Sequence, residues 1–287
     1  MTFYLGILLA LACAAVTQLG FLYKHRGACE AATVDIAHPL RSAKALFANR
    51  WFALGWCVAV GAWLLHVAAM ALAPLSVVQA VLSCGVVMLA VLADRGFGFK
   101  VGARQWVGVG LTALGLIMLV VTLPQAPSAH SHFSVPAMIA FEAGMLAVGA
   151  LLISGKRLGA ADHHHALLLG AAAGILFGVS DVAIKALTGA DGLMGVLLSP
   201  WLAVTLLASV FAFYASARGL QDGEAVPVIA ATSTAANVSA IAGGILVFGD
   251  PMPGDALGII AQIMAFALVI IAAVLVPPPV RAAAANA

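Results

Sequence analysis

The sequence predicts an all-α, polytopic integral membrane protein of about nine transmembrane helices, and its composition supports this fold class. Of the 287 residues, 64% are hydrophobic and 8% are charged, against about 45–50% and about 25% in an average soluble domain. The mean hydropathy is +1.12. The apolar runs lack the alternating polar residues of a transmembrane barrel. An ordinary soluble protein and a disordered chain are therefore excluded, and a net charge of +2 is too small to attract nucleic acid.

A transmembrane helix needs about 20 mainly apolar residues, and the sequence offers successive segments of about this length. The connection between the first two, residues 24–50, is long enough for one amphipathic helix and contains Pro39. The predicted segments cover residues 3–23, 51–72, 75–93, 106–123, 135–153, 166–187, 201–217, 225–248 and 256–275.

The loop charges predict the orientation of these segments. Every Lys and Arg residue except Lys185 falls in a connection or tail on the same side of the membrane. Since basic residues accumulate in cytoplasmic loops, we expect the N-terminus outside, the C-terminus inside and an odd number of helices. The expected location is the plasma membrane (the inner membrane of the cell), with multiple passes.

The order of elements repeats weakly along the chain. Residues 1–123 form a first repeat of four helices, residues 124–165 a linker helix with its loops, residues 166–277 a second repeat, and residues 278–287 a cytoplasmic tail. Helices one to four correspond to helices six to nine, so each helix lies five spans before its counterpart. Because five is an odd number, the two helices of each pair cross the membrane in opposite directions, and the two repeats are predicted to be inverted. Inverted repeats are typical of secondary transporters, whose sites lie near the midplane between the repeats.

Three charged residues lie within predicted spans, where charges are costly and face a bundle interior or a water-filled path. They are Glu142, Asp181 and Lys185. Asp181 and Lys185 continue a stripe of small residues on their helix, which allows close approach of a neighbouring helix. The stripe consists of Gly170, Gly174 and Gly178. The two charges either line a transport pathway or neutralise each other as an intrahelical pair. Glu142 either carries a proton or a cation, or is a protonated packing residue.

Neutral polar residues gather near the middle of segment 225–248. They are Thr232, Ser233, Thr234, Asn237 and Ser239. This cluster predicts a cavity wall that contacts substrate, with interhelical hydrogen bonds as the alternative. Gln79 and Ser83 lie at the corresponding depth of the first repeat and would form the opposite wall. His66 is a further pathway candidate, although a lone His on an apolar helix is usually a packing residue.

No motif for a cofactor or an ATP-binding module is present, and no enzymatic activity is predicted. If the substrate is a divalent cation, Glu142 and Asp181 are the candidate ligands. The loop histidines 130, 132 and 163–165 have no spacing typical of a structural zinc site. The expected partners are therefore the lipid bilayer and a small solute or cation, with no nucleic acid, and a homodimer stays open.

Two short motifs resemble the ends of the repeats in the drug/metabolite transporter superfamily (EamA-like). Leu-Ala-Asp94-Arg precedes a Gly-rich helix, and Val-Phe-Gly-Asp250-Pro251 precedes Gly258. That superfamily usually has Glu at the acidic position and ten helices, so Asp94, Asp250 and the count of nine are departures. The resemblance implies a transporter of a metabolite, drug, lipid or other small solute.

The layout is more similar to the nine-helix NIPA-like magnesium transporter branch of that superfamily. The segment from Gly20 through Lys24 to Gly27 resembles the basic-Gly signature at the end of that branch's first helix. A long polar loop and a Trp-led helix follow in the same order, and Arg218 through Ser239 resembles the branch's eighth-helix region. This resemblance implies transport of Mg²⁺.

The sequence thus predicts a secondary transporter of a small solute that works by alternating access. Magnesium or another divalent cation is the alternative substrate. Two readings from other classes are a non-transporting accessory subunit and a membrane enzyme that acts on a lipid, for which the loops supply only the His163–His165 run.

Overall fold

A computed structural model describes most of the chain. The residues described are 2–35, 38–85, 88–89, 99–100, 132–159, 162–223, 225–250, 253–275 and 280–281, with single positions between 107 and 118. The predicted fourth segment, Asp94, Pro251, His130 and most of the tail lie outside these residues.

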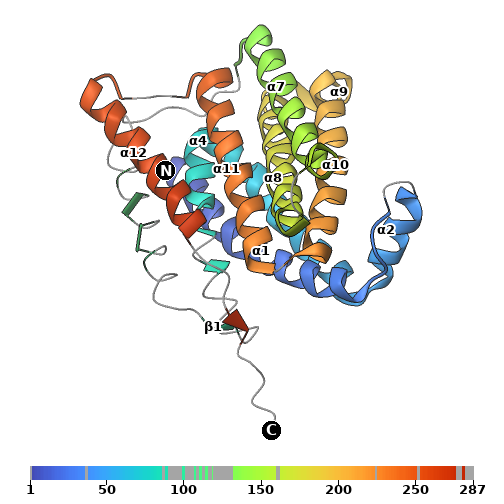
Figure 1. The fold of residues 1–287 in the computed structure, drawn as a ribbon. Coiled ribbons are helices and arrows are strands. Elements are labelled where there is room, and N and C mark those ends of the chain that lie inside the picture. Colours follow the sequence, from blue (N-terminus) through green and yellow to red (C-terminus); the bar gives the residue numbers. More distant parts are fainter. Residues whose placement is uncertain are drawn as a thin grey trace.

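The described part is a bundle of helices with one very short strand pair (Figure 1). Phe99–Lys100 (β1) pairs antiparallel with Val280–Arg281 (β2). The helices of the first half are α1 (Thr2–Glu30), α2 (Pro39–Ala48), α3 (Arg50–Leu72) and α4 (Leu75–Leu82). The later helices are α7 (Val135–Ile153), the 3-10 turn η1 (Gly155–Leu158), α8 (Asp162–Leu187), α9 (Gly192–Leu198), α10 (Pro200–Asp222), α11 (Ala225–Phe248) and α12 (Ala256–Leu275).

Six of these helices are long and apolar enough to cross a membrane, within the described residues. They lie in α1, α3, α7, α8, α10 and α11. Each coincides with a segment predicted from the sequence, so the prediction of a multi-pass helical membrane protein is confirmed. The count of nine spans and the orientation stay predictions. The helix α12 begins and ends where the ninth segment was predicted, and α4 begins where the third was predicted.

Local sequence signals explain where the helices of the first half begin and end. Asn49 caps α3, because its side-chain oxygen accepts hydrogen bonds from the backbone N–H groups of Trp51 and Phe52. The helix α3 ends before Pro74, which cannot donate a backbone hydrogen bond and starts α4. The first helix runs past its predicted end at residue 23, through Lys24 to Glu30, where an ion pair joins Arg26 to Glu30.

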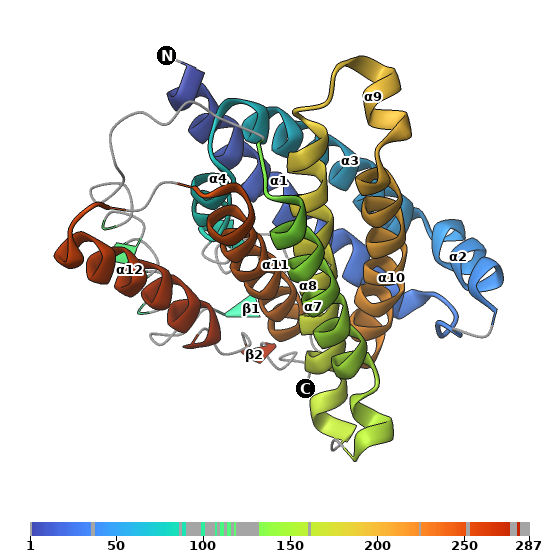
Figure 2. The same cartoon turned by 90° about the horizontal axis from the view of Figure 1, so that it is seen from above.

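The two halves of the bundle pack in similar ways. The helix α1 packs along α3 and also contacts α4, while α8 packs along α10 and α11. Short helices, α2 and α9, follow α1 and α8 respectively. The halves meet where α4 lies against α11 and where α1 contacts α10. Seen from above, α8 lies between α7, α10 and α11, and α12 lies at the edge beside α11 (Figure 2). An inverted relation of the halves stays a prediction.

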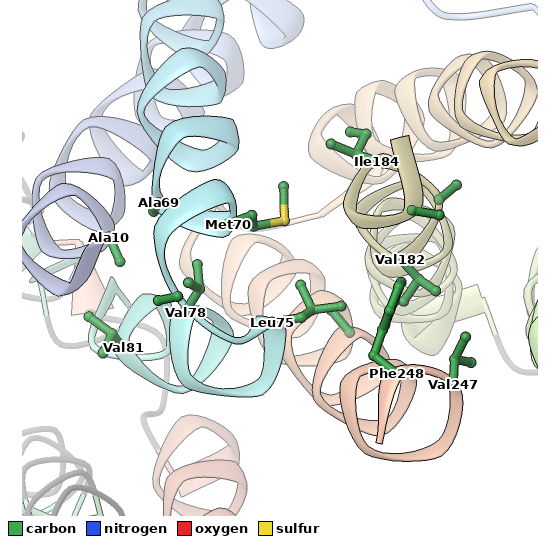
Figure 3. Close-up of a cluster of buried hydrophobic side chains, with 14 of the residues drawn as sticks. Ala10, Ala69, Met70, Leu75, Val78, Val81, Val182, Ile184, Val247 and Phe248 are labelled. Carbon is green, nitrogen blue, oxygen red and sulfur yellow. The ribbon is translucent and has the colours of Figure 1, made fainter. Parts of the chain in front are cut away.

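The largest hydrophobic cluster lies where α3 ends and α4 begins. It joins residues of both halves, including Met70, Leu75, Ile184, Val247 and Phe248 (Figure 3). Met70 and Leu75 are fully buried. Phe133 packs edge-on against Phe248 and Trp201 at this end. This end of the bundle is thus closed by apolar side chains.

Candidate functional site

Three polar side chains from three helices meet in the middle of the bundle. The Gln79 Nε2 of α4 donates to Asp181 Oδ2 of α8 at 2.9 Å and lies 3.0 Å from His66 Nε2 of α3. His66 Nδ1 lies 3.6 Å from Asp181 Oδ1. The side chains of His66 and Asp181 are only 11% and 14% exposed. The structure therefore brings together three candidates that are far apart in the sequence.

The hydrogen bonds of this cluster favour one tautomer of the His66 imidazole. The amide nitrogen of Gln79 is a donor, so His66 Nε2 accepts from it. The proton of neutral His66 is then on Nδ1, which faces the Asp181 carboxylate. Within the described residues, no Lys or Arg forms an ion pair with Asp181. Among the described residues, the Asp181 carboxylate is thus contacted by an amide and an imidazole rather than by a Lys or Arg side chain.

A second polar contact joins α1 to α11. Gln18 Nε2 of α1 donates to Ser233 Oγ of α11 at 3.3 Å. Gln18 also lies against Gly85, where an added Cβ would approach Gln18 Nε2 to 2.6 Å. Gln18 Oε1 is buried and accepts no hydrogen bond from the described residues. A buried carbonyl oxygen without a donor is costly, and it is a ligand type suited to hard cations.

These two contacts define what we call the polar column: His66, Gln79, Asp181, Gln18 and Ser233. Gln79 lies in α4 and Gly85 follows that helix, so residues 79–85 connect the first contact to the second. The polar column thus draws its side chains from α1, α3, α4, α8 and α11.

The five polar side chains near the middle of α11 do not all make the same kind of contact. Ser233 belongs to the column, and Asn237, 7% exposed, lies one turn further on the same face. Thr232 donates to its own helix at Val228 O, and Ser239 to Ala235 O. Thr234 Oγ1 is buried and has no partner among the described groups. Two of the five polar side chains therefore bond within α11 rather than across helices.

The glycine stripe of α8 faces α11. A Cβ on Gly174 would overlap the backbone carbonyl of Thr232, and one on Gly178 would lie 2.5 Å from Ser239 Cβ. A Cβ on Gly170 would come within 3.0 Å of the Val228 carbonyl. The absence of side chains at these positions allows the backbones to approach closely. The stripe thus fixes α8 against α11.

Lys185 does not pair with Asp181 within α8. It is fully buried, and its Nζ donates to the backbone carbonyls of Met70 at 2.7 Å and Ala73 at 3.3 Å. These carbonyls end α3, where the negative end of the helix dipole favours a cation. Asp181 instead bonds His66 and Gln79. Asp181 and Lys185, one turn apart on α8, thus contact different partners.

Glu142 lies apart from the polar column. It is 4% exposed on α7, and neither carboxylate oxygen has a hydrogen-bond partner in the described part of the chain. On the same helix, Phe141 lies against Gly243 of α11. Among the described residues, no hydrogen bond or ion pair joins Glu142 to Asp181 or Asn237. The structure does not show the two carboxylates sharing a site.

The structure adds two candidate functional residues that were not among the pathway residues predicted from the sequence. Gln18 is one isolated amide in the first helix, and only its contact with Ser233 marks it. Asp250 accepts from the Ser76 backbone N–H at 2.7 Å while being 4% exposed. The sequence signal that was available for Asp250 was its place in a Gly-Asp-Pro turn directly after a long apolar helix. No group of three or more His, Cys, Asp or Glu side chains suited to a metal occurs among the described residues.

Comparisons with known proteins give one match. No family model matches the chain, and no solved structure matches it. The chain is 25% identical to a protein named "Probable magnesium transporter NIPA9" from Arabidopsis thaliana, over 281 residues that cover 94% of this chain and 81% of the relative. Membership of the wider EamA-like superfamily stays a prediction. The chain is thus a multi-pass membrane protein that is similar, along nearly its whole length, to a probable magnesium transporter.

Proposed function

We propose that this protein is a secondary transporter of Mg²⁺ and that the cation passes along the polar column. The observation that carries the proposal is the buried Asp181 carboxylate, which sits where α3, α4 and α8 meet and, among the described residues, is contacted by the Gln79 amide and the His66 imidazole. Similarity along 94% of the chain to a probable magnesium transporter supports the choice of cation.

The chemistry of the column suits a hard cation that is bound briefly. Mg²⁺ prefers oxygen ligands and usually keeps several waters while one or two carboxylates bind it. Asp181 provides the charge, and Gln18 Oε1 provides a second oxygen that no described donor occupies. One carboxylate with neutral oxygens binds less tightly than a cluster of carboxylates, which favours release as well as entry.

Transport assays on purified protein in liposomes test this proposal. We expect Mg²⁺ flux from the wild-type protein and a loss of about tenfold or more in Asp181→Asn, since each 1.4 kcal/mol of lost binding free energy costs a factor of about ten in affinity. This exchange keeps the shape of the side chain and removes its charge. Asp255→Asn is the matched control, because Asp255 is an exposed carboxylate that caps its own helix at Gly258.

Four outcomes contradict parts of the proposal. Wild-type flux in Asp181→Asn removes Asp181 from the pathway. A larger loss in Glu142→Gln than in Asp181→Asn places the pathway on α7 instead. Flux of amino acids or cationic drugs without flux of Mg²⁺ changes the substrate class. Absence of flux that a co-purified partner restores indicates an accessory subunit.

A further inference from the structure

We propose that Lys185 and Asp250 form a clamp that closes one end of the polar column and releases during transport. The clamp is made of these two side chains and the break between α3 and α4, at Ala73 and Pro74. The inference rests on the proposed transport function, because a clamp that releases needs a transport cycle to act in.

The break between α3 and α4 leaves unpaired backbone groups of opposite polarity. The last carbonyls of α3 and the first N–H groups of α4 have no partner within their helices. In a membrane each such group must be satisfied by the protein, because lipid offers no hydrogen bonds. The break therefore needs a donor on one side and an acceptor on the other.

Both partners come from the second half of the chain. Lys185 of α8 donates to Met70 O and Ala73 O, while Asp250, which follows α11, accepts from Ser76 N. Each charge matches the end of the helix dipole that it faces. Asp250 also donates its own backbone N–H to Gly244 O at 2.9 Å, which ties the turn to α11. The two halves are thus joined at this break by charged hydrogen bonds.

The clamp lies one helical turn beyond the polar column. Lys185 is four residues from Asp181 on α8, and Ser76 is three residues from Gln79 on α4, so each pair shares a helix face. Met70 is four residues from His66 on α3. The hydrophobic cluster of Met70, Leu75, Ile184, Val247 and Phe248 surrounds the clamp. A cation in the column reaches this end only if the clamp opens.

The clamp is buried, and its hydrogen-bonding groups are not all satisfied within the described residues. Lys185 is 0% exposed and Asp250 is 4% exposed. Asp250 Oδ1 is buried with no partner in the described part of the chain. Buried charges that are incompletely paired give a modest net stabilisation, because desolvation offsets the attraction. The closed state is therefore held by specific contacts that can be exchanged for water when the end opens.

Thiol accessibility tests the clamp without any assay of transport. In a chain whose four cysteines (Cys13, Cys29, Cys57 and Cys84) are replaced, Ser76→Cys places a near-isosteric reporter at the clamp. We expect slow reaction with a membrane-impermeant maleimide when the clamp is intact. We expect the rate to rise about tenfold in Lys185→Met or Asp250→Ala, because the lost charge-assisted bonds shift the equilibrium toward the open state.

Two controls separate opening of the clamp from general unfolding. Asp255→Asn removes an exposed helix-capping carboxylate outside the clamp and is expected to leave the Ser76→Cys rate unchanged. A second reporter, Ser239→Cys, is buried between α8 and α11 and is expected to stay unreactive in every variant. An unchanged Ser76→Cys rate in Lys185→Met overturns the clamp. A rise at both reporters also overturns it, since the whole bundle has then loosened.

A covalent lock links the clamp to transport. In the double variant Ser76→Cys, Asp250→Cys, we expect oxidation to a disulfide to stop Mg²⁺ flux and reduction to restore it. Flux that persists after the thiols have been consumed shows that this end does not open in the cycle. If no variant transports Mg²⁺ but the maleimide rates change as expected, the clamp stands and the choice of substrate fails.

Discussion

The bundle has two comparable breaks, one between α3 and α4 and one between α10 and α11, and the chain holds them differently. At the first, buried Lys185 and Asp250 bond the two helix ends. At the second, Gln221 in the last turn of α10 ties that helix end to the end of α1 and the segment after it, because it donates to Ala28 O and Ala32 O and accepts from Val34 N. These contacts are exposed or partly buried.

The two sets of hydrogen bonds differ in how easily water can replace them when they break. Water takes over the bonds of Gln221 at little cost, because the groups already lie near solvent. Buried charged groups lose far more when their partners leave. In both breaks the bonds join the first half of the chain to the second. The helix ends at α3 and α4 are therefore held by buried charged hydrogen bonds, whereas the end of α10 is held by hydrogen bonds that water can replace.

The replacement of Lys185 by Met should have the largest effect on this comparison. It leaves the buried Met70 and Ala73 carbonyls without their charged donor. Because each buried carbonyl left unsatisfied costs about 1–3 kcal/mol, we expect a loss of about 3 kcal/mol or more in the free energy of unfolding. Lys24→Met is the matched variant, because the Lys24 ammonium lies 3.9 Å from the Phe21 ring and such a contact stabilises by about 0.5–2 kcal/mol. Denaturant titrations in detergent measure both. Equal losses would remove the distinction between the two lysines.

An intermediate effect is expected from Gly244→Ala. The added Cβ would lie 2.5 Å from Asp250 Oδ2 and 2.9 Å from Ser76 N, so it pushes the carboxylate away from the α4 N-terminus. Overpacking of this kind costs about 1–3 kcal/mol. Gly61→Ala is the control, because nothing lies within 4 Å of its added Cβ. Thermal melts in the same detergent compare the two, and a Gly244→Ala protein as stable as Gly61→Ala would show that the carboxylate is not confined.

The smallest effect should come from Gln221→Ala at the exposed end. We expect a loss of about 1 kcal/mol, since water replaces most of the hydrogen bonds. Hydrogen exchange of residues 28–34 should become faster, while exchange at Ser76 stays slow. Mass spectrometry of peptides from both regions measures this. A loss in stability as large as that in Lys185→Met would contradict the view that the second break is weakly held.

Much of the fold followed from length and hydropathy, because lipid requires long apolar helices whatever their neighbours are. Asp181 and Gln79 were candidates because polar groups in spans are rare. The sequence did not show which side chains these residues contact. Whether Asp181 bonds Lys185 on its own helix or His66 on another depends on tertiary packing, since both fit the local spacing. Gln18 carried no local signal at all, because one amide in an apolar helix has many explanations.

The Gly170–Gly178 stripe also limits which helices can move. Because the two backbones are in contact with no side chain between them, we expect α8 and α11 to move together in any conformational change. Asp181 and Lys185 of α8 would then keep their positions relative to Ser233 of α11. We expect the short helix α4, which begins after Pro74 and contacts both α1 and α11, to tilt against this pair of helices, and the tilt would change the contact of Gln79 with Asp181.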